Sequence, residues 1–514
     1  MRTPILAAIL GGLGLAAGGG YYGLEIYPEQ QFRAALDQSI ARLPPGVTVT
    51  YATAHYSVLS HLATVTGIRL HAARADAAPQ PVDAVIDSME VSNPNLSFSQ
   101  TWANAQANPS SCGDDTALPI ADTIVITGVS IHAATMDMTQ ASFTVDKARL
   151  YPRALLHEGM PTFAAFQAAA IPKSQPPTLA DLQPLLRLEA AGMLGIGYDN
   201  YDAEGLSLSV NITDVDLTYK VRKMAGTGFD RGVMRGATIE GLTTKSSQFG
   251  AFTLDRMVMS AFDIRDPATR LINGESLSVS MLDGITIGRV DYDGITAQAP
   301  GKPAMHAGGM SIGPVSFTKG LPVSAAIAFR DFRIEASLLP DARSQDGFSK
   351  LGLEQATISF AMAYDWDVAG KRASIHDTSL KVDELGTLSL SADLTNLGTT
   401  TNVLSLAQAR LGHARLRLED ASLADRLLGL GAAMAGTDEE AFRQQVVATM
   451  QQPDTGPELK AAQIAVATFI TSPKTLTVEL APPAPVPVML LAGAAGSPAR
   501  LAMMLGLKVT ANAP

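Results

Sequence analysis

The sequence predicts a mainly β protein with α insertions, in which long amphipathic antiparallel strands form an extended curved sheet or a sandwich. The first observation is alternation: within Ala356–Val368, every second residue from Ile358 onward is apolar. One-sided alternation indicates an antiparallel sheet with one apolar and one wet face. Glycine-led repeats at the starts of such segments, and three regions with helical spacing, are the other two observations.

The same alternation marks further strands along the chain. The segment from Leu206 to Val221 alternates in two opposite phases, which indicates a bulge or bend at Thr213-Asp214. The other predicted strands cover residues 47–51, 124–131, 143–150, 277–281, 388–394 and 476–480.

Glycine stands at a fixed place in two recurrent strings. In the first, an apolar residue and glycine precede alternating apolar residues, and the string begins at residues 249, 287, 312 and 385. This irregular spacing excludes a fixed-period solenoid and indicates a tight turn or bulge where a strand starts. In the second, glycine precedes a branched or leucine side chain and a hydroxyl, at residues 128, 241, 284 and 294. The repetition predicts one sheet extended by similar hairpins.

Helical spacing occurs in three regions. Gln30–Leu43 carries an apolar stripe and ends at a pair of prolines. Residues 152–196 hold two helical stretches broken by prolines, and a third region begins after Ser422. Within that region Thr437 and Glu440 have the spacing of a capping box, which predicts a new helix through to residue 450.

These patterns divide the chain into five regions. They are an N-terminal membrane anchor or signal segment (1–27), a helical neck with the first β region (28–151), a helical insertion (152–200), a repeated antiparallel β region (201–410) and a mixed α/β C-terminal region (411–514). In the last region, APPAPVPV is predicted to be a stiff extended linker. Two short apolar helical patches follow it and are too interrupted for a membrane span.

The N-terminal segment is long enough to cross a bilayer. No charged residue lies between Pro4 and Leu24, a run of 21 residues. Arg2 before the run and Glu25 after it place the N-terminus in the cytoplasm and export the remainder. The alternative is cleavage after Ala16-Ala17-Gly18, which would release a periplasmic or secreted protein. We favour a retained inner-membrane anchor, because the run exceeds a typical signal-peptide apolar core.

Composition restricts the partners. The chain has 514 residues and a net charge of −11 without any basic block, which makes nucleic acid an unsuitable partner. Cys112 is the only cysteine, so no intramolecular disulfide can form.

Catalytic and metal motifs are weak. Ser311 lies in a G-x-S-x-G string, but that nucleophile elbow needs a strand before the serine and a helix after it. Pro314 and renewed alternation follow instead, so a serine hydrolase using Ser311 is the least favoured function. Residues 200–205 resemble half a calcium loop, but Asn211 stands where the bidentate carboxylate is required. We interpret this segment as an acidic turn and expect no metal, no cofactor and no enzymatic activity.

The apolar face of the sheet is the remaining candidate. Such a face must be covered by a second sheet, by helices or by a ligand. A closed sandwich with a dry core is one solution, and a curved sheet that holds acyl chains is the other. The predicted lining of such a groove is Ile358, Phe360, Met362, Tyr364 and Trp366. Methionines at 136, 138, 257, 259 and 362 would suit a groove or a core equally.

The first seventy residues also resemble a known group. A short apolar segment followed by YYGLEIYPEQQFRAALDQSIARLPPGVTVTYATAHYSVLSHLATVTGIRLH is similar in layout to the YdgA-like group of membrane-anchored bacterial envelope proteins, and more loosely to AsmA-like proteins. The resemblance implies an inner-membrane helix, a helical neck and a long run of amphipathic strands that act in lipid homeostasis or passage. It transfers no functional residue.

Together these observations predict a non-enzymatic protein of the cell envelope, anchored in the inner membrane with its bulk in the periplasm. Its predicted role is binding of lipid or another apolar ligand along a β-sheet groove in envelope maintenance. The alternative is a structural or protein-interaction module with a dry β-sandwich core.

Overall fold

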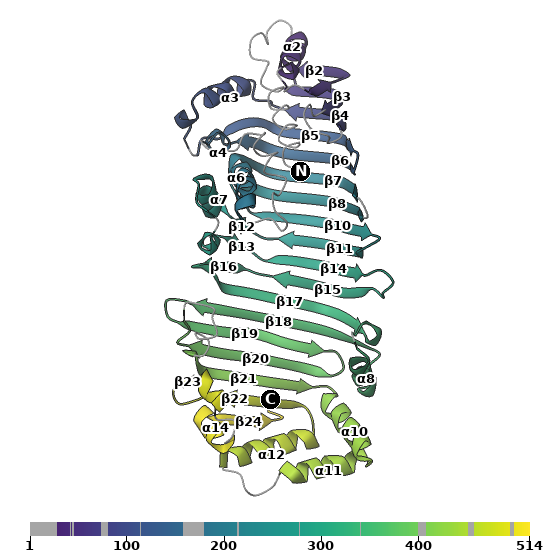
Figure 1. The fold of residues 1–514 in the computed structure, drawn as a ribbon, viewed down its shortest axis with the longest axis vertical. Coiled ribbons are helices and arrows are strands. Elements are labelled where there is room, and N and C mark those ends of the chain that lie inside the picture. Colours follow the sequence, from purple (N-terminus) through teal and green to yellow (C-terminus); the bar gives the residue numbers. More distant parts are fainter. Residues whose placement is uncertain are drawn as a thin grey trace. The chain divides into compact units, whose positions relative to one another are not determined.

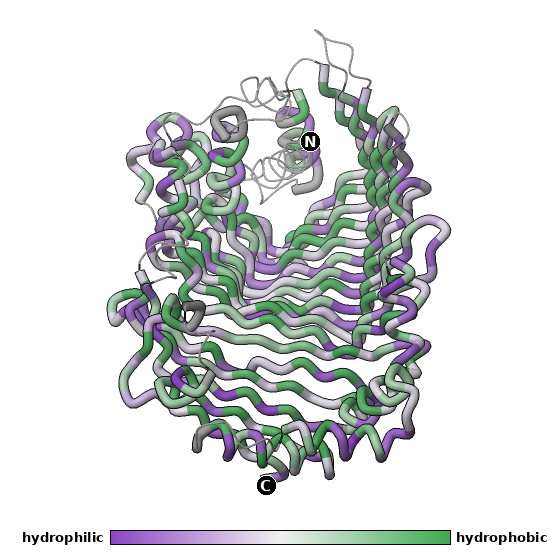
Figure 2. Tube along the Cα trace, turned by 60° about the horizontal axis from the view of Figure 1, so that its bottom comes forward, coloured by the Kyte–Doolittle hydropathy of each residue, from purple (hydrophilic) through white to green (hydrophobic). Residues whose placement is uncertain are grey.

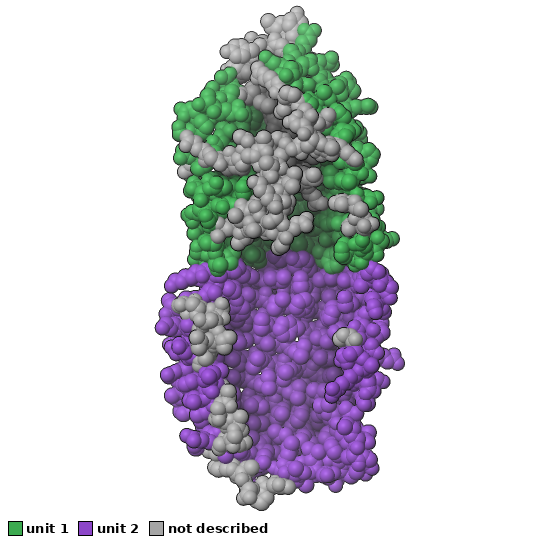
Figure 3. Space-filling model, viewed as in Figure 1, with its two compact units in different colours: residues 1–288 green, residues 289–514 purple. Residues whose placement is uncertain are grey.

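The computed structural model describes residues 28–513, with the exception of 42, 44–45, 73–80, 114, 158–178, 213–214, 277, 340, 399–407, 451–456 and 494–497. The chain divides into two compact units, which Figure 3 shows in separate colours: unit 1, Met1–Gly288, and unit 2, Arg289–Pro514. The predicted anchor at residues 4–24 lies outside the described residues. No helix within the described ranges is long and apolar enough to cross a membrane.

Unit 1 contains one antiparallel sheet whose strands mostly pair in chain order (Figure 1). β1 and β2 both pair with β3, each strand from β3 to β7 pairs with the next, and β8 pairs with β9 and β10. β10 pairs with β11, and β12 pairs with β9 and β13. The strands are β1 (Val47–Thr50), β2 (Thr53–Ser57), β3 (Leu62–Ala72), β4 (Val82–Ser92), β5 (Leu118–Ala133), β6 (Met136–Leu150), β7 (Ile196–Ile212), β8 (Val215–Asp230), β9 (Val233–Met234), β10 (Gly236–Ser246), β11 (Gly250–Met259), β12 (Phe262–Asp263) and β13 (Thr286–Ile287).

Unit 2 also contains one antiparallel sheet. β14 pairs with β15, β15 and β16 pair with β17, and each strand from β17 to β20 pairs with the next. β21 pairs with β22 and β23, and β22 pairs with β24. The strands are β14 (Val290–Gln298), β15 (Met305–Ile312), β16 (Val315–Thr318), β17 (Leu321–Glu335), β18 (Gln355–Asp367), β19 (Arg372–Val382), β20 (Gly386–Thr395), β21 (Arg410–Asp420), β22 (Thr475–Leu480), β23 (Val486–Pro487) and β24 (Leu507–Ala511). The predicted mainly β, antiparallel fold is confirmed. The described strands of each unit join one large antiparallel sheet.

The apolar residues of unit 1 form rows that run across the strands. Cross-strand partners share a face of the sheet, so each row lies on one side. One such row contains Ala54, Val65, Met89, Ile126, Phe143, Ala203, Met224, Ile239 and Met257. Its members from β2 to β5 are almost fully buried. Figure 2 shows the alternation of apolar and polar positions along these strands, which bend midway.

A line of glycines accompanies this bend. Gly67, Gly128, Gly205 and Gly241 lie on β3, β5, β7 and β10 and have φ between 61° and 66°. The strand register places these four glycines close to a single line that also crosses the intervening strands β4, β6 and β8. This conformation suits glycine, and it produces a bulge that turns the strand. Two of the four glycine–branched–hydroxyl strings, at 128 and 241, lie in this line, whereas Gly284 lies in a turn.

The predicted bulge at Thr213-Asp214 is wrong, because a hairpin stands there. Ile212 pairs with Val215 and Val210 pairs with Leu217. A two-residue turn reverses the phase of alternation in the sequence while it keeps the apolar side chains on one face. The two turn residues themselves lie outside the described ranges.

Two further expectations are also wrong. Residues 200–205 belong to β7 rather than to an acidic turn, since Lys223 Nζ lies 2.7 Å from Asp202 and 3.3 Å from Glu204 and offsets their charge on the wet face. The predicted strand at 277–281 contains a 3₁₀ helix, Val279–Leu282, instead. The Arg270 guanidinium donates to the carbonyl oxygen of Ser280 and thus uses a group that a ladder would need.

The helices of unit 1 are α2 (Pro28–Ile40), α3 (Phe98–Ala107), α4 (Pro152–Leu155), α6 (Leu179–Gly195) and α7 (Arg265–Ile272). α2 confirms the predicted helix after residue 30, and its Phe32 and Leu36 pack into the main core beside Tyr56. Arg33 Nε also donates to the carbonyl oxygen of Ala54 in β2. The predicted helical insertion at 152–200 ends early, because β7 begins at residue 196 and Gly197 already pairs with Arg149 of β6.

The helices of unit 2 are α8 (Ala342–Lys350), α10 (Leu423–Ala435), α11 (Glu439–Met450), α12 (Pro457–Thr471), α13 (Val488–Gly493) and α14 (Pro498–Leu505). The helix predicted to run to residue 450 is confirmed, but its cap is not Thr437: Asp438 Oδ1 accepts from the amide of Ala441. A carboxylate just before a helix accepts a hydrogen bond from a backbone N–H of the first turn, which has no partner within the helix. The predicted linker APPAPVPV contributes β23 to the sheet, where Val486 pairs with Leu411.

Substitution of two glycines of unit 1 by alanine should have opposite effects. A Cβ at Gly205 would lie 2.8 Å from the Cβ of Ala141, with φ at +66°. We expect Gly205→Ala to lower the free energy of unfolding by about 1–3 kcal/mol. Gly192 lies inside α6, and a Cβ there would meet nothing within 4 Å. Gly192→Ala should raise the free energy of unfolding by up to about 1 kcal/mol. Denaturant unfolding measures both, and an unchanged midpoint for Gly205→Ala would contradict the proposed role of the bulge.

Candidate functional site

The five residues predicted to line a groove all lie on β18, at every second position. Their cross-strand pairing with β17 places Ile358 opposite Phe332, Phe360 opposite Phe329 and Tyr364 opposite Ala325. Since residues two apart in a strand point to the same side, the five share one face of the unit 2 sheet. Tyr364 donates its hydroxyl proton to the carbonyl oxygen of Pro322, whereas Trp366 Nε1 is buried without a hydrogen-bond partner among the described residues.

Two long apolar rows cross this face. The first contains Tyr292, Met310, Phe329, Phe360, Leu380, Leu388, Leu418, Leu476 and Ala511. The second contains Val290, Ile312, Ile327 and Met362 on β14 to β18, and Thr378, Leu390, Leu416, Val478 and Val509 beyond the bulge in β19. Neither row has a charged side chain.

A contiguous part of these rows is exposed to solvent. We call it the open apolar patch; its members, with their exposed fractions, are Met362 (36%), Leu380 (41%), Leu388 (37%), Leu390 (38%) and Leu416 (38%). They occupy β18 to β21, which at a spacing of ~4.8 Å between strands corresponds to about 14 Å. Large aliphatic side chains gathered on one exposed face mark a binding surface more often than scattered ones do.

One helix covers the neighbouring part of the same face. Leu501, Met504 and Leu505 of α14 pack with Leu411 and Val486, and the same cluster includes Leu394, Ala414 and Leu480. The coverage stops before the open apolar patch. In unit 1, by contrast, α2 contributes Phe32 and Leu36 to a core cluster, and the strand residues of that cluster are almost fully buried.

Sequence reasoning predicted two of the four strands of this site, β18 and β20, but assigned only Met362 of the open apolar patch to the lining. The strand at 388–394 was predicted, but Leu380, Leu388, Leu390 and Leu416 were not assigned to the lining. Their alternation with serine, threonine and arginine was the available signal. The register that places them beside Met362 depends on which strands pair, and the alternation within a single strand does not contain that information.

The polar face of the same strands carries a charged clamp. His376 Nε2 lies 2.8 Å from Asp365 Oδ2, and its Nδ1 lies 2.9 Å from Asp377 Oδ2. These two hydrogen bonds, the one to Asp377 first, raise the pKa of His376 above its ordinary value. The clamp joins β18 to β19 directly behind the open apolar patch.

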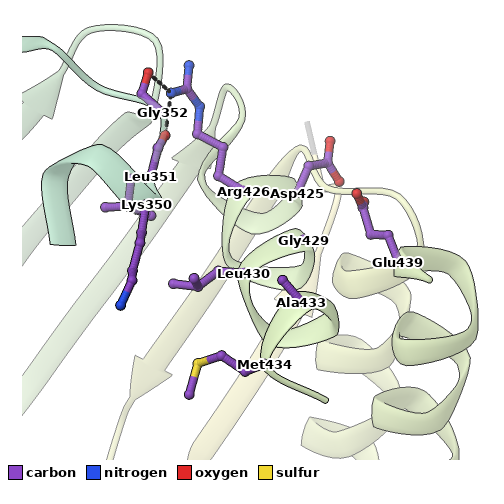
Figure 4. Close-up of a pocket in the computed structure, with 10 residues that line it drawn as sticks. All are labelled: Lys350, Leu351, Gly352, Asp425, Arg426, Gly429, Leu430, Ala433, Met434 and Glu439. Atoms are coloured by element: carbon purple, nitrogen blue, oxygen red, sulfur yellow. Dashed lines mark hydrogen bonds between the residues drawn. The ribbon is translucent and has the colours of Figure 1, made fainter. Parts of the chain in front are cut away.

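A groove of about 730 Å³ lies between α10 and the residues that precede β18 (Figure 4). Arg426 crosses it: Nη1 donates to the carbonyl oxygen of Leu351 at 2.7 Å, and Nη2 donates to Glu384 at 3.0 Å. The acids of its far wall, Asp425 and Glu439, both accept from Arg443 at 2.8 Å. Arg426 thus links α10 to the residues before β18, and the charged side chains Arg426, Asp425 and Glu439 each have a partner of opposite charge.

The catalytic and metal candidates occupy ordinary structural positions. Ser311 lies within β15, opposite Asp291 and Ala328, and the strand β16 follows it where an elbow would have a helix. Among the described residues no group of three or more histidine, cysteine or acidic side chains could hold a metal ion.

A family described as "Uncharacterized protein" matches residues 379–512, which include Leu380, Leu388, Leu390 and Leu416 of the open apolar patch together with α10 to α14. No curated protein matches the chain.

The histidine clamp predicts a pH dependence of stability. Because the folded-state pKa of His376 is raised, the clamp stabilises the folded state fully below the unfolded-state pKa near 6.5, and the stabilisation is lost as the pH rises through the folded-state value. The side chain is 39% exposed, so we expect an amplitude below about 1 kcal/mol. Thermal unfolding of the parent and of His376→Gln between about pH 6 and pH 8 measures it.

The matched control is His306→Gln, in which the lost ring contacts the hydroxyl of Thr296 at 3.0 Å rather than a carboxylate. This variant should keep the parental pH profile. If His376→Gln also keeps that profile, the clamp does not contribute.

Proposed function

We propose that this chain is a non-enzymatic protein of a bacterial cell envelope that binds the acyl chain of a lipid on the open apolar patch. The observation that supports the proposal is the exposure of five aliphatic side chains, from Met362 to Leu416, on adjacent strands of a single sheet. Ligand sites are mostly apolar with few polar groups, and a site without any charged side chain suits a hydrocarbon chain.

Leucine and methionine favour a flexible ligand of this kind. Their side chains adopt several rotamers, and methionine in particular adapts to irregular apolar shapes. The two rows also run across the strands, so an extended chain laid along a row would contact one side chain on each strand. An aromatic or compact ligand would use fewer of these contacts.

A dry structural core explains unit 1 better than unit 2. In unit 1 the apolar row is nearly fully buried from Ala54 to Ile126, and α2 packs against it. In unit 2 the side chains of the open apolar patch are each more than a third exposed. In a module with a dry core, these side chains would be buried.

Location in the envelope is part of the proposal and is supported by the sequence. Residues 4–24 form an uncharged segment of membrane-spanning length that follows Arg2 and precedes two acidic residues. We propose that this segment anchors the chain in the inner membrane and that both units lie in the periplasm, where an acyl-chain site would serve envelope maintenance.

A matched pair of charge substitutions tests the ligand site. Leu390 belongs to the open apolar patch, and Ser389 is its neighbour on the opposite face, across from Arg417. Leu390→Glu places a carboxylate in the patch, where an acyl chain would have to desolvate it. We expect lipid recovered with the purified protein, measured by native mass spectrometry and solvent extraction, to fall about tenfold, equivalent to about 1.4 kcal/mol.

Ser389→Glu adds the same charge to the wet face, and this variant should retain the lipid. Circular dichroism and thermal unfolding establish that both variants fold. Lipid recovery that is equal in the two variants, or absent from the parent, would overturn the proposed site.

A further inference from the structure

Of the two short helices near the C-terminus, α14 is apolar on more than one side and α13 exposes two large apolar side chains. In α14, Leu501, Met504 and Leu505 face the sheet. On its outer side Met503 is 63% exposed. In α13, which follows β23 directly, Met489 and Leu490 are 61% and 53% exposed. A helix that is apolar all round normally lies inside a protein or against lipid.

The charge of this segment differs from that of the whole chain. After Glu479, the only charged side chains are Arg500 and Lys508, whereas the complete sequence carries a net charge of −11. Arg500 and Met503 are both exposed and three residues apart, so they share one face of α14. Exposed apolar residues next to a basic residue, without acidic neighbours, are typical of helices that lie in the interface of an anionic bilayer.

α10 and α11 lack this combination, and α12 exposes one large apolar side chain, Ile464, in a helix that carries both Glu458 and Lys460. Leu427 and Met434 of α10 are also exposed, at 50% and 82%. Acidic residues surround them, however: Asp425 lies in the first turn of α10, and Glu439 and Glu440 begin the next helix. An anionic surface would repel α10 and α11, so the exposed apolar residues of α13 and α14 suit such a surface better.

We infer that α13 and α14 form a membrane-contact surface that lies on an anionic lipid bilayer through Met489, Leu490 and Met503, with Arg500 at the headgroups. The same α14 covers the face that carries the open apolar patch, at Leu394 and Leu480. The contact therefore places a bilayer beside the proposed acyl-chain site. Three apolar side chains and one basic residue give weak and reversible binding.

A local probe tests the contact in the full chain, because its signal does not depend on what the N-terminal segment does. Cys112→Ser removes the only native thiol, and the contact there is from Arg153 to the backbone carbonyl of residue 112, which the substitution retains. Ala499→Cys then places an environment-sensitive fluorophore on the exposed side of α14. Ala342→Cys, at the exposed start of α8, is the matched control.

Vesicles of phosphatidylethanolamine and phosphatidylglycerol, supplied in excess, provide the bilayer. We expect the probe at residue 499 to shift its emission to shorter wavelength and to be quenched by lipids brominated in their acyl chains. The probe at 342 should do neither. Vesicles of phosphatidylcholine alone, which carry no net charge, should give a smaller signal at 499.

Charge substitutions at the exposed positions identify the contact residues. Met489→Glu combined with Met503→Glu should abolish the signal at 499, and both side chains are exposed, so the fold should tolerate the change. Met434→Glu, on α10, should leave it unchanged. The inference would be overturned by the absence of a lipid-dependent signal at residue 499, or by an equal signal at residue 342. It would also be overturned by an emission shift at residue 499 that grows with protein concentration when no vesicles are present. The last result would identify a second copy of the chain as the partner.

The proposed membrane contact and the proposed acyl-chain site can be disproved independently of each other. Leu390→Glu should lose lipid on purification but keep the probe signal. Met489→Glu combined with Met503→Glu should lose the signal but keep the bound lipid. The inference therefore goes beyond the proposed function without depending on its result.

Discussion

Backbone hydrogen bonding between successive antiparallel strands is the interaction on which the rest of this structure depends. It determines which side chains stand opposite one another, and therefore which share a face. In unit 1 it aligns Ala54 with Val65 and continues to Met257 on β11. In unit 2 it aligns Phe360 with Leu380 and Leu388. A slip of one residue in any strand would transfer its apolar side chains to the wet face, so the rows exist only because the register is kept.

The apolar face of a single sheet must be covered by other elements. The two units differ in how much of that face their helices cover. α2 packs its apolar stripe against the first strands of unit 1, where the core cluster includes Phe32, Tyr56 and Val65. In unit 2, α14 covers one end of the face and leaves the side chains of β18 to β21 partly exposed. The helices, more than the strands, thus distinguish the closed face from the open one.

Sequence reasoning could identify the strands but not their partners. The alternation from 356 to 368 located β18 to within one residue at each end, because a period of two is a property of the strand itself. The hairpin at 213–214 was misinterpreted because Thr-Asp lacks the glycine that normally marks a two-residue turn. Exposure of Leu390 could not be derived at all, since it depends on which helix covers that part of the sheet. The anchor, the envelope location and the ligand stay predictions.

Stability alone does not account for leucine at these positions. A side chain that stays more than a third exposed gains only part of the free energy of ~0.8 kcal/mol that each buried methylene contributes. On the other face of β20 the corresponding residues are Thr387, Ser389 and Ser391. Small polar residues are thus compatible with this strand, and at the leucine positions they would have reduced the tendency of an exposed apolar face to associate. Leucine at these positions supplies the apolar surface that the proposed acyl-chain site requires.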